Sequence, residues 1–249
     1  MRVEIWSDVV CPWCYVGTRR FEEAVERFRA EGGGDVEVVH RAFELDPTVP
    51  AEGMDLAGYL ARKFGGSDRL SQVHDRLDHA GSDVDIHFRW DGKRRANTFD
   101  AHRLGAWALD TAGPERQNAL HQLLFRAYFT DNLDISDHGV LAGLAADVGL
   151  DRSLAAEVLA TGAYAKTVRA EELAAGERDI HAVPTFVIEG RWAIPGAQDI
   201  DTFVEMLARA SERLAPLTVA PMPAATPSSP GAAKAGTADT DCNDGACAT

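Results

Sequence analysis

The cysteines of this 249-residue chain stand in two pairs at opposite ends of the sequence. Cys11 and Cys14 enclose Pro12-Trp13, and Cys242 and Cys247 stand near the C-terminus. No cysteine occurs in residues 15–241, unlike the spread of cysteines in a disulfide-stapled secreted domain. Closely paired cysteines in such a chain are more often redox-active or metal-binding than structural.

The first pair has the spacing of a redox-active dithiol at the start of a helix. The free N–H groups and the dipole of a helix start favour the thiolate form of Cys11. Pro12 suits the first helical position, where its missing N–H is not needed. We therefore expect Cys11 to attack disulfides, the more buried Cys14 to resolve the mixed disulfide, and Trp13 to shield the pair on one side.

The alternative is that this pair supplies two ligands of a zinc site. Structural zinc takes four ligands, so two more would be needed nearby. Residues 15–60 add only His40, so redox chemistry is favoured and no metal site is predicted; a zinc site built from both cysteine pairs is a minor option. Six histidines show no spacing typical of a metal site, and we interpret them as structural: His40, His74, His79, His87, His121 and His138.

The elements around the dithiol form a β-α-β unit. Residues 2–6 and 36–43 alternate like half-buried strands, and between them a helix with apolar residues three to five apart ends at 32–34. Helical spacing follows from about 50 to 178, with an ambiguous piece at 86–90 that favours either a loop or a short strand; the clearest helices are expected at 97–112, 114–131, 136–149 and 151–179. Strand character returns at 184–188, Glu189-Gly190 predicts a hairpin turn, and residues 196–199 open a last helix.

Val183-Pro184 begins this later strand, where a proline that cannot donate to the sheet is tolerated or functional. A cis X–Pro bond costs only about 0.5–1 kcal/mol. Such a bond would leave the Val183 backbone free to pair with an extended substrate beside the dithiol.

Residues 216–241 are rich in Pro, Ala, Gly, Ser and Thr, which predicts a flexible linker. Its r.m.s. span of roughly 28 Å would let Cys242 or Cys247 reach the Cys11–Cys14 site. The tail carries aspartates that disfavour thiolates, so we expect electrons to flow from the tail dithiol to a Cys11–Cys14 disulfide. The alternative is a disordered tail with incidental thiols.

Several segments together resemble the DsbA-like thioredoxin-fold oxidoreductases, with the cytoplasmic FrnE type as the most similar branch; they are residues 7–14, 43–47, 97–98 with 101–103, 183–186 and 196–198. The resemblance covers about residues 1–215 and extends to the tail pair. It implies an α/β thioredoxin fold with a large all-helical insertion, a flexible C-terminal tail and a cis Pro184. The parts would be 1–48 and 179–215 for the thioredoxin fold, 49–178 for the insertion and 216–249 for the tail.

The related 2-hydroxychromene-2-carboxylate isomerases and kappa-class glutathione transferases resemble the insertion but usually carry serine where Cys11 stands. The presence of both cysteines therefore favours a thiol–disulfide oxidoreductase. The alternative is a glutathione-dependent isomerase or transferase. Periplasmic DsbA proteins usually carry Pro-His between the cysteines, so their redox potential does not transfer to Pro-Trp.

Relatives bind glutathione near the segment that matches residues 97–102, which makes Asn97 and His102 candidates for the substrate cleft. For Asn97 the role of a helix N-cap is favoured over a place in the cleft, whereas His102 suits an ordinary helix surface equally well. Gln198 is a further candidate to face the dithiol, or else caps the last helix. Asp8, three residues before Cys11, is a candidate proton relay for Cys14 or an exposed loop carboxylate.

The formal net charge is −14, from 25 Lys+Arg against 39 Asp+Glu, which disfavours nucleic acid and anionic membranes as partners. No apolar run approaches the roughly 18 residues that span a bilayer, and the first residues are typical of a strand rather than a signal peptide. We expect a cytoplasmic monomer or homodimer that acts on protein or small-molecule thiols and disulfides. No cofactor is predicted, and glutathione stays open as a co-substrate.

Overall fold

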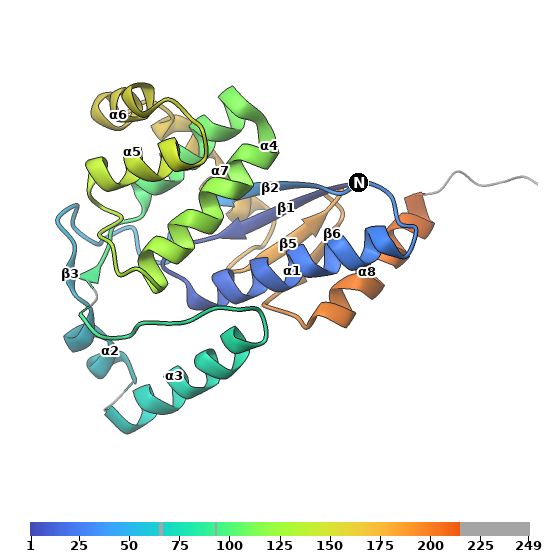
Figure 1. Ribbon diagram of the computed structural model, residues 1–249, viewed down its shortest axis with the longest axis horizontal. Coiled ribbons are helices and arrows are strands. Elements are labelled where there is room, and N and C mark those ends of the chain that lie inside the picture. The colour runs from blue at the N-terminus through green and yellow to red at the C-terminus, as the bar shows by residue number, and fades with distance from the viewer. Residues whose placement is uncertain (65–66, 93, 215–249) are drawn as a thin grey trace, which may run out of the picture. The chain divides into compact units, whose positions relative to one another are not determined.

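The computed structural model describes residues 1–214 except 65–66 and 93. The tail pair Cys242 and Cys247 lies outside the described residues. The strands are β1 (Arg2–Ser7), β2 (Glu37–Ala42), β3 (Met54–Asp55), β4 (Arg94–Arg95), β5 (Thr185–Ile188) and β6 (Trp192–Pro195). The helices are α1 (Pro12–Ala30), α2 (Leu56–Phe64), α3 (Ser67–Ser82), α4 (Phe99–Phe129), α5 (His138–Asp147), α6 (Arg152–Thr161), α7 (Ala165–Glu177) and α8 (Ile200–Leu214) (Figure 1).

The main sheet has the strand order β2-β1-β5-β6. The crossover through α1 makes β1 and β2 parallel, whereas β5 runs antiparallel to both β1 and β6. The β5–β6 hairpin turns at Glu189 and Gly190, whose φ angles of 50° and 65° are both positive. This is a thioredoxin-like sheet interrupted between β2 and β5 by a helical insertion, so the predicted fold class is confirmed.

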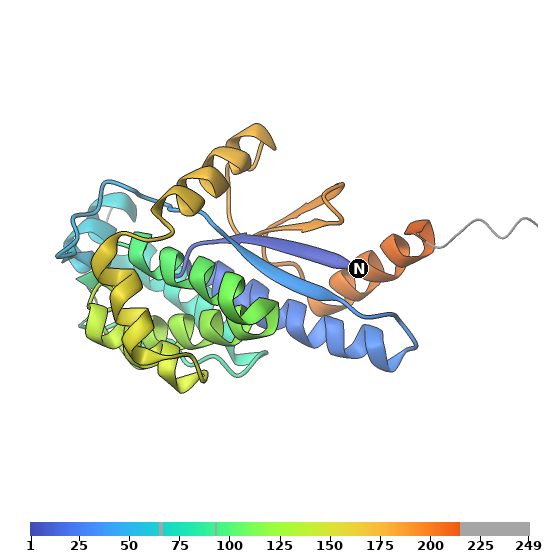
Figure 2. The ribbon, with the colours of Figure 1, turned by 90° about the horizontal axis from the view of Figure 1, so that it is seen from above.

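Each face of the sheet is covered by helices, as the alternation along β1 requires. Val3 and Ile5 face α1 and α8, where they pack with Phe21, Phe186 and Phe203. Trp6, one residue further along, lies in a separate cluster with residues of β5 and α7. Figure 2 shows α7 on one side of the sheet and α1 with α8 on the other.

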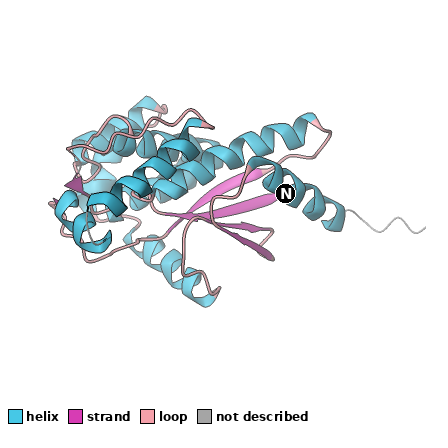
Figure 3. Cartoon of the chain, turned by 90° about the horizontal axis from the view of Figure 1, so that it is seen from below, coloured by secondary structure: helices cyan, strands magenta, loops and turns pink. Residues whose placement is uncertain are grey.

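The insertion differs in detail from the predicted helices. The break predicted between two helices at residue 113 is confirmed, because Gly113 is not helical (φ 82°, ψ 179°) and divides α4 into two halves. The single helix predicted over 151–179 is wrong, because left-handed backbone at Gly162 and Tyr164 separates α6 from α7. Residues 86–90 form no strand. The pair β3–β4 was not predicted, since two residues are too short to show alternation; Figure 3 shows it among the helices, apart from the main sheet.

Side chains of the insertion occupy the open edge of β2. The Gln117 amide accepts a hydrogen bond from the His40 N–H and donates one to the His40 carbonyl, each 2.9 Å long. The Ala42 N–H donates to a Glu171 carboxylate oxygen (2.9 Å). The edge strand is thereby paired without a further strand, which joins the insertion to the sheet.

No helix in the described part of the chain is both long enough and apolar enough to cross a membrane.

Candidate active site

The dithiol lies at the N-terminus of α1, immediately after β1. Cys11 is the N-cap residue, with extended backbone (φ −91°, ψ 112°), and Pro12 occupies the first turn. The Cys14 N–H donates to the Cys11 carbonyl (3.0 Å), which closes the first helical turn. Both cysteines are free thiols; Cys11 keeps 6% of its surface exposed and Cys14 none. This order of burial is the one expected of an attacking and a resolving thiol.

Burial raises the pKa of Cys14 well above its ordinary value. The hydrogen bond with Cys11 and the negative charges of Cys11 and Asp8 act in the same direction, while a backbone hydrogen bond with Asp8 opposes them. Cys14 is therefore held as a protonated thiol, and it must lose this proton before it can attack a disulfide.

The segment before β5 lies directly against Cys11. The Val183–Pro184 peptide bond is cis, as the resemblance implies, and the Cys11 thiol lies 3.8 Å from the Val183 carbonyl oxygen. Gly17 allows this approach: a Cβ atom there would lie 3.0 Å from the Pro184 ring and 3.1 Å from the Ala197 side chain. Helix α1 thus contacts the segments that lead into β5 and α8.

A cavity of about 330 Å³ opens beside Cys11. Trp13, the half-exposed neighbour of Cys11, lines it together with Asp8 and Pro12. Its opposite wall comes from the insertion; the apolar part is Val49, Leu56, Leu60, Leu70, Val73 and Leu77, and the aromatic part is Tyr59, Trp90, Tyr128 and Phe129. The insertion therefore roofs the reactive thiol with apolar and aromatic side chains.

Two titratable residues that line this cavity, Arg95 and His74, stack on aromatic rings. Arg95 forms an ion pair with Asp46 and stacks on the Tyr59 ring at 3.7 Å. His74 stacks on Trp90, with ring centroids 4.1 Å apart, and burial lowers the pKa of His74. The helical spacing of the apolar residues in 56–77 predicted helices here, but nothing in that spacing shows that their faces enclose the thiol.

Asp8 and His102, two separately predicted candidates, lie against each other beneath the dithiol. The His102 Nε2 is 3.5 Å from the Asp8 Oδ1, and each side chain is only 1% exposed. The other Asp8 oxygen accepts a hydrogen bond from the Leu45 N–H (2.7 Å). Asp8 is thus not an exposed loop carboxylate, and His102 lies neither on the helix surface nor among the residues that line the cavity.

The pKa of His102 is raised above its ordinary value. Burial alone would lower this pKa, but the interaction with Asp8 and the negative charges of Glu44 and Glu171 outweigh burial. The Asp8 side chain thus favours the protonated form of the buried His102 imidazole.

Asn97 and Gln198 lie outside the wall of the cavity. Asn97 donates to the Val49 carbonyl (2.7 Å) and accepts from the Phe99 N–H (3.0 Å), so it fastens the start of α4. Gln198 donates to the Pro195 carbonyl (2.7 Å) before α8. Their contacts in this structure are local, and a role in substrate binding stays a prediction.

The sequence did not predict that the rings of His40 and His121 stack on each other. Their centroids are 4.1 Å apart and their planes 8° from parallel. Burial lowers the pKa of His40 to about 4 and that of His121 well below its ordinary value. The two residues are far apart in the sequence, so no spacing signal could have joined them.

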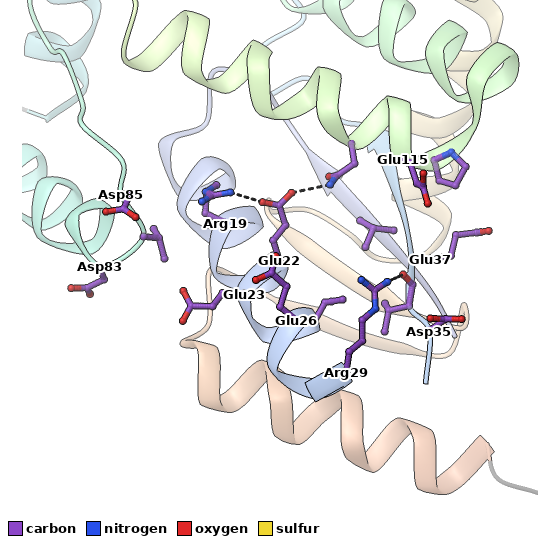
Figure 4. A pocket seen from close by; sticks show the side chains of 16 residues that line it. Arg19, Glu22, Glu23, Glu26, Arg29, Asp35, Glu37, Asp83, Asp85 and Glu115 are labelled. Carbon is purple, nitrogen blue, oxygen red and sulfur yellow. Dashed lines mark hydrogen bonds and ion pairs between the residues drawn. The ribbon is translucent and has the colours of Figure 1, made fainter. Parts of the chain in front are cut away.

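A larger hollow of about 1030 Å³ lies elsewhere, between α1, β2 and the start of the second half of α4 (Figure 4). Acidic side chains dominate it, among them Glu22, Glu26, Glu37 and Glu115, and no cysteine borders it. Glu22 accepts hydrogen bonds from Asn118, Gln122 and Arg19. In the part of the chain that the structure describes, no group of three or more His, Cys, Asp and Glu side chains is placed to hold a metal ion.

Comparison with known proteins finds the same fold and the same family. The uncharacterized protein YwbO of Bacillus subtilis is 31% identical over 208 residues, which are 82% of this chain and 94% of that protein. The crystal structure of a probable DsbA oxidoreductase from Streptomyces coelicolor is 36% identical, with a TM-score of 0.78 over 93% of this chain and all of the other. A 2-hydroxychromene-2-carboxylate isomerase structure is similar in fold, with 18% identity and a TM-score of 0.61 over 86% of this chain and 96% of that chain.

The model of a family described as the DSBA-like thioredoxin domain matches residues 2–208. This match spans the dithiol, the insertion, the Val183–Pro184 segment and most of α8. With a free dithiol at the start of α1 and a thioredoxin-like sheet behind it, this chain belongs to the family of DSBA-like thioredoxin domains.

Proposed function

We propose that this protein is a thiol–disulfide oxidoreductase that works through Cys11 and Cys14. One observation carries the proposal: a slightly exposed thiol at a helix start, beside a cavity, stands one turn before a fully buried second thiol. A single nucleophilic cysteine would suffice for addition chemistry, whereas two thiols one turn apart can exchange a disulfide.

The reaction follows from this order of burial. The Cys11 thiolate attacks a substrate disulfide, forms a mixed disulfide and releases one substrate thiol. Cys14 then loses its proton and attacks the Cys11 sulfur, so that the second substrate thiol leaves and a Cys11–Cys14 disulfide forms. The substrate gains two electrons and the dithiol loses two; the reverse sequence oxidises a substrate dithiol.

Substrate recognition is proposed to use the backbone beside Cys11. The Val183 carbonyl lies at the thiol, which supports pairing with an extended substrate segment. Protein or small-molecule thiols and disulfides are the proposed substrates, with glutathione as a co-substrate. The absence of cysteines from residues 15–241 is compatible with the cytoplasm and with the FrnE-type branch of the family.

The tail pair Cys242 and Cys247 is proposed as an internal redox partner of Cys11–Cys14. The support is the length and composition of residues 216–241 and the aspartates beside the tail thiols. Tethering would give the tail dithiol an effective concentration of about the millimolar range at the site. Electrons would pass from the tail dithiol to the Cys11–Cys14 disulfide.

Thiol counting by mass spectrometry across a glutathione redox series tests both proposals. Wild type is compared with Cys242→Ser/Cys247→Ser and with Cys14→Ser. We expect a reversible two-electron transition at Cys11–Cys14, and in Cys14→Ser a mixed disulfide that accumulates on Cys11. A transition that changes when the tail cysteines are removed supports the internal relay, and an unchanged transition refutes it.

The alternative predicts other results in the same experiment. A glutathione-dependent isomerase or transferase would retain its activity in Cys14→Ser, bind glutathione saturably and show no reversible Cys11–Cys14 couple. That combination would overturn the oxidoreductase proposal.

A further inference from the structure

Resolution of the mixed disulfide requires a proton to leave a fully buried thiol. Cys14 has no exposed surface, so water cannot accept its proton directly. Asp8 is the carboxylate next to this thiol: its backbone carbonyl accepts from the Cys11 N–H (2.9 Å), and its side chain lines the cavity beside Cys11. Asp8 therefore has both the chemistry and the place to accept the proton.

Burial of the Asp8 carboxylate needs compensation, because an unpaired charge in the interior is costly. The Leu45 and Val10 N–H groups donate to it at 2.7 Å and 3.4 Å. The opposite charge comes from His102, whose Nε2 lies 3.5 Å from the carboxylate. His102 belongs to α4, so the insertion supplies the partner of a residue in the thioredoxin part.

We propose that His102 is a positioning residue for the thiol–disulfide reaction: its imidazolium holds the buried Asp8 carboxylate in place, so that Asp8 can accept the Cys14 proton during resolution. The inference rests on the proposed function and assigns the proton of its second step. Asp8 takes the proton as Cys14 attacks the Cys11 sulfur, and the departing substrate thiolate is then protonated from solvent or by Asp8.

The charges around His102 favour its protonated form. Glu44 and Glu171 add negative charge from the segment after β2 and from α7. Each of these carboxylates is itself bound by an arginine, Arg169 at 2.5 Å and Arg41 at 2.7 Å. His40 and His121, whose pKa values burial lowers, also act on this site from β2 and α4, and Tyr128 of α4 interacts with Asp8.

When the proton moves to Asp8, the imidazolium of His102 remains in the buried site, next to a carboxyl group that has become neutral. Its charge and that of the new Cys14 thiolate attract each other across Asp8, and this attraction is poorly screened in a buried site. A neutral side chain at position 102 would leave the thiolate without this stabilisation. The resolution rate should therefore depend on the charge of residue 102.

Stopped-flow reaction with a limiting amount of dithionitrobenzoate isolates the attack of Cys14 on the mixed disulfide. The full-length Cys242→Ser/Cys247→Ser chain leaves only Cys11 and Cys14 to react. The first release of thionitrobenzoate reports attack by Cys11, and the second, independent of protein concentration, reports attack by Cys14. In Cys14→Ser the second release must disappear; if it persists, the proposed function fails, whatever His102 does.

We expect His102→Asn to slow the second release roughly 10- to 100-fold at neutral pH and to remove an inflection from its pH profile. His102→Lys should keep the rate within a few-fold of wild type and also lack the inflection, because lysine stays charged. His87→Gln, at an exposed histidine, should retain the wild-type profile.

Two results would overturn the assignment: pH profiles of wild type and His102→Asn that superimpose, or a folded His102→Lys chain as slow as His102→Asn. If His102→Asn does not fold, NMR titration of His102 in the wild type gives the answer. The midpoint of this titration must then coincide with the inflection in the pH profile of the second release in the wild type, because the charge of His102 sets that rate; midpoints that differ contradict the proposal.

Discussion

Three buried histidines lie close to one another, and among them only His102 has a raised pKa. His102 has Asp8 as a partner, whereas His40 and His121 stack on each other. His40 Nε2 lies 2.8 Å from the Asn118 side-chain oxygen, a neutral partner that does not offset burial. The carboxylate thus reverses the direction of the pKa shift for His102, because burial by itself lowers the pKa of all three imidazoles.

The stacked pair predicts acid sensitivity. The pKa of His40 falls from 6.5 in the unfolded chain to about 4 in the folded chain, and that of His121 also falls, so the unfolded state binds more protons in that window. Stability contributed by these neutral rings is lost as pH falls below about 6.5, by up to about 1.4 kcal/mol per pH unit for each histidine. The raised pKa of His102 has the opposite effect: its contribution to stability is lost only as pH rises above about 6.5.

Urea unfolding at a series of pH values measures this effect as the difference between wild type and His121→Phe. Glu22 and Glu44, whose pKa values burial raises, partly oppose the histidines in the same window, and both chains contain them. The free energy of unfolding should depend less steeply on pH in His121→Phe. Replacement of the exposed His87 is the control; an equal change in both variants would contradict the prediction.

At the scale of elements, the site depends on how closely α1 approaches two neighbouring segments. Gly17 faces Pro184 and Ala197 at distances that leave no room for a methyl group without displacement. Gly17→Ala should therefore destabilise the protein by about 1–3 kcal/mol, as overpacking does. It should also change the rate at which Cys11 reacts with dithionitrobenzoate, since the Val183 carbonyl that precedes Pro184 contacts the thiol.

Gly143→Ala in α5 is the matched control, because a Cβ there meets nothing within 4 Å. That substitution should stabilise its helix by about 0.5–1 kcal/mol. Urea unfolding of both variants gives the comparison. A Gly17→Ala chain as stable as Gly143→Ala would show that the contact has room to relax.

For the whole molecule, the described residues belong to a unit with its own cores on both sides of the sheet and in the insertion. A chain that ends at Ala215 should therefore fold, with a free energy of unfolding within about 0.5 kcal/mol of the full chain, the usual effect of surface changes. Calorimetry checks this, and a large loss of stability would mean that residues 216–249 contribute to the fold.

Local sequence signals were sufficient for much of the framework. The alternation of β1, the dithiol at the start of α1 and the hairpin at Glu189-Gly190 were predicted because each depends on residues a few positions apart. The break between α6 and α7 was missed, since Tyr164 adopts left-handed backbone that its residue type does not signal.

The sequence by itself thus determined which thiols can react and which kind of sheet carries them. Only the tertiary structure decided that His102 is buried against Asp8, that α2 and α3 enclose the cavity, and that Gln117 pairs with the edge of β2. These contacts join segments far apart in the chain through side-chain packing. Periodicity reports which face of an element is buried, but it carries no information on which distant side chain that face meets.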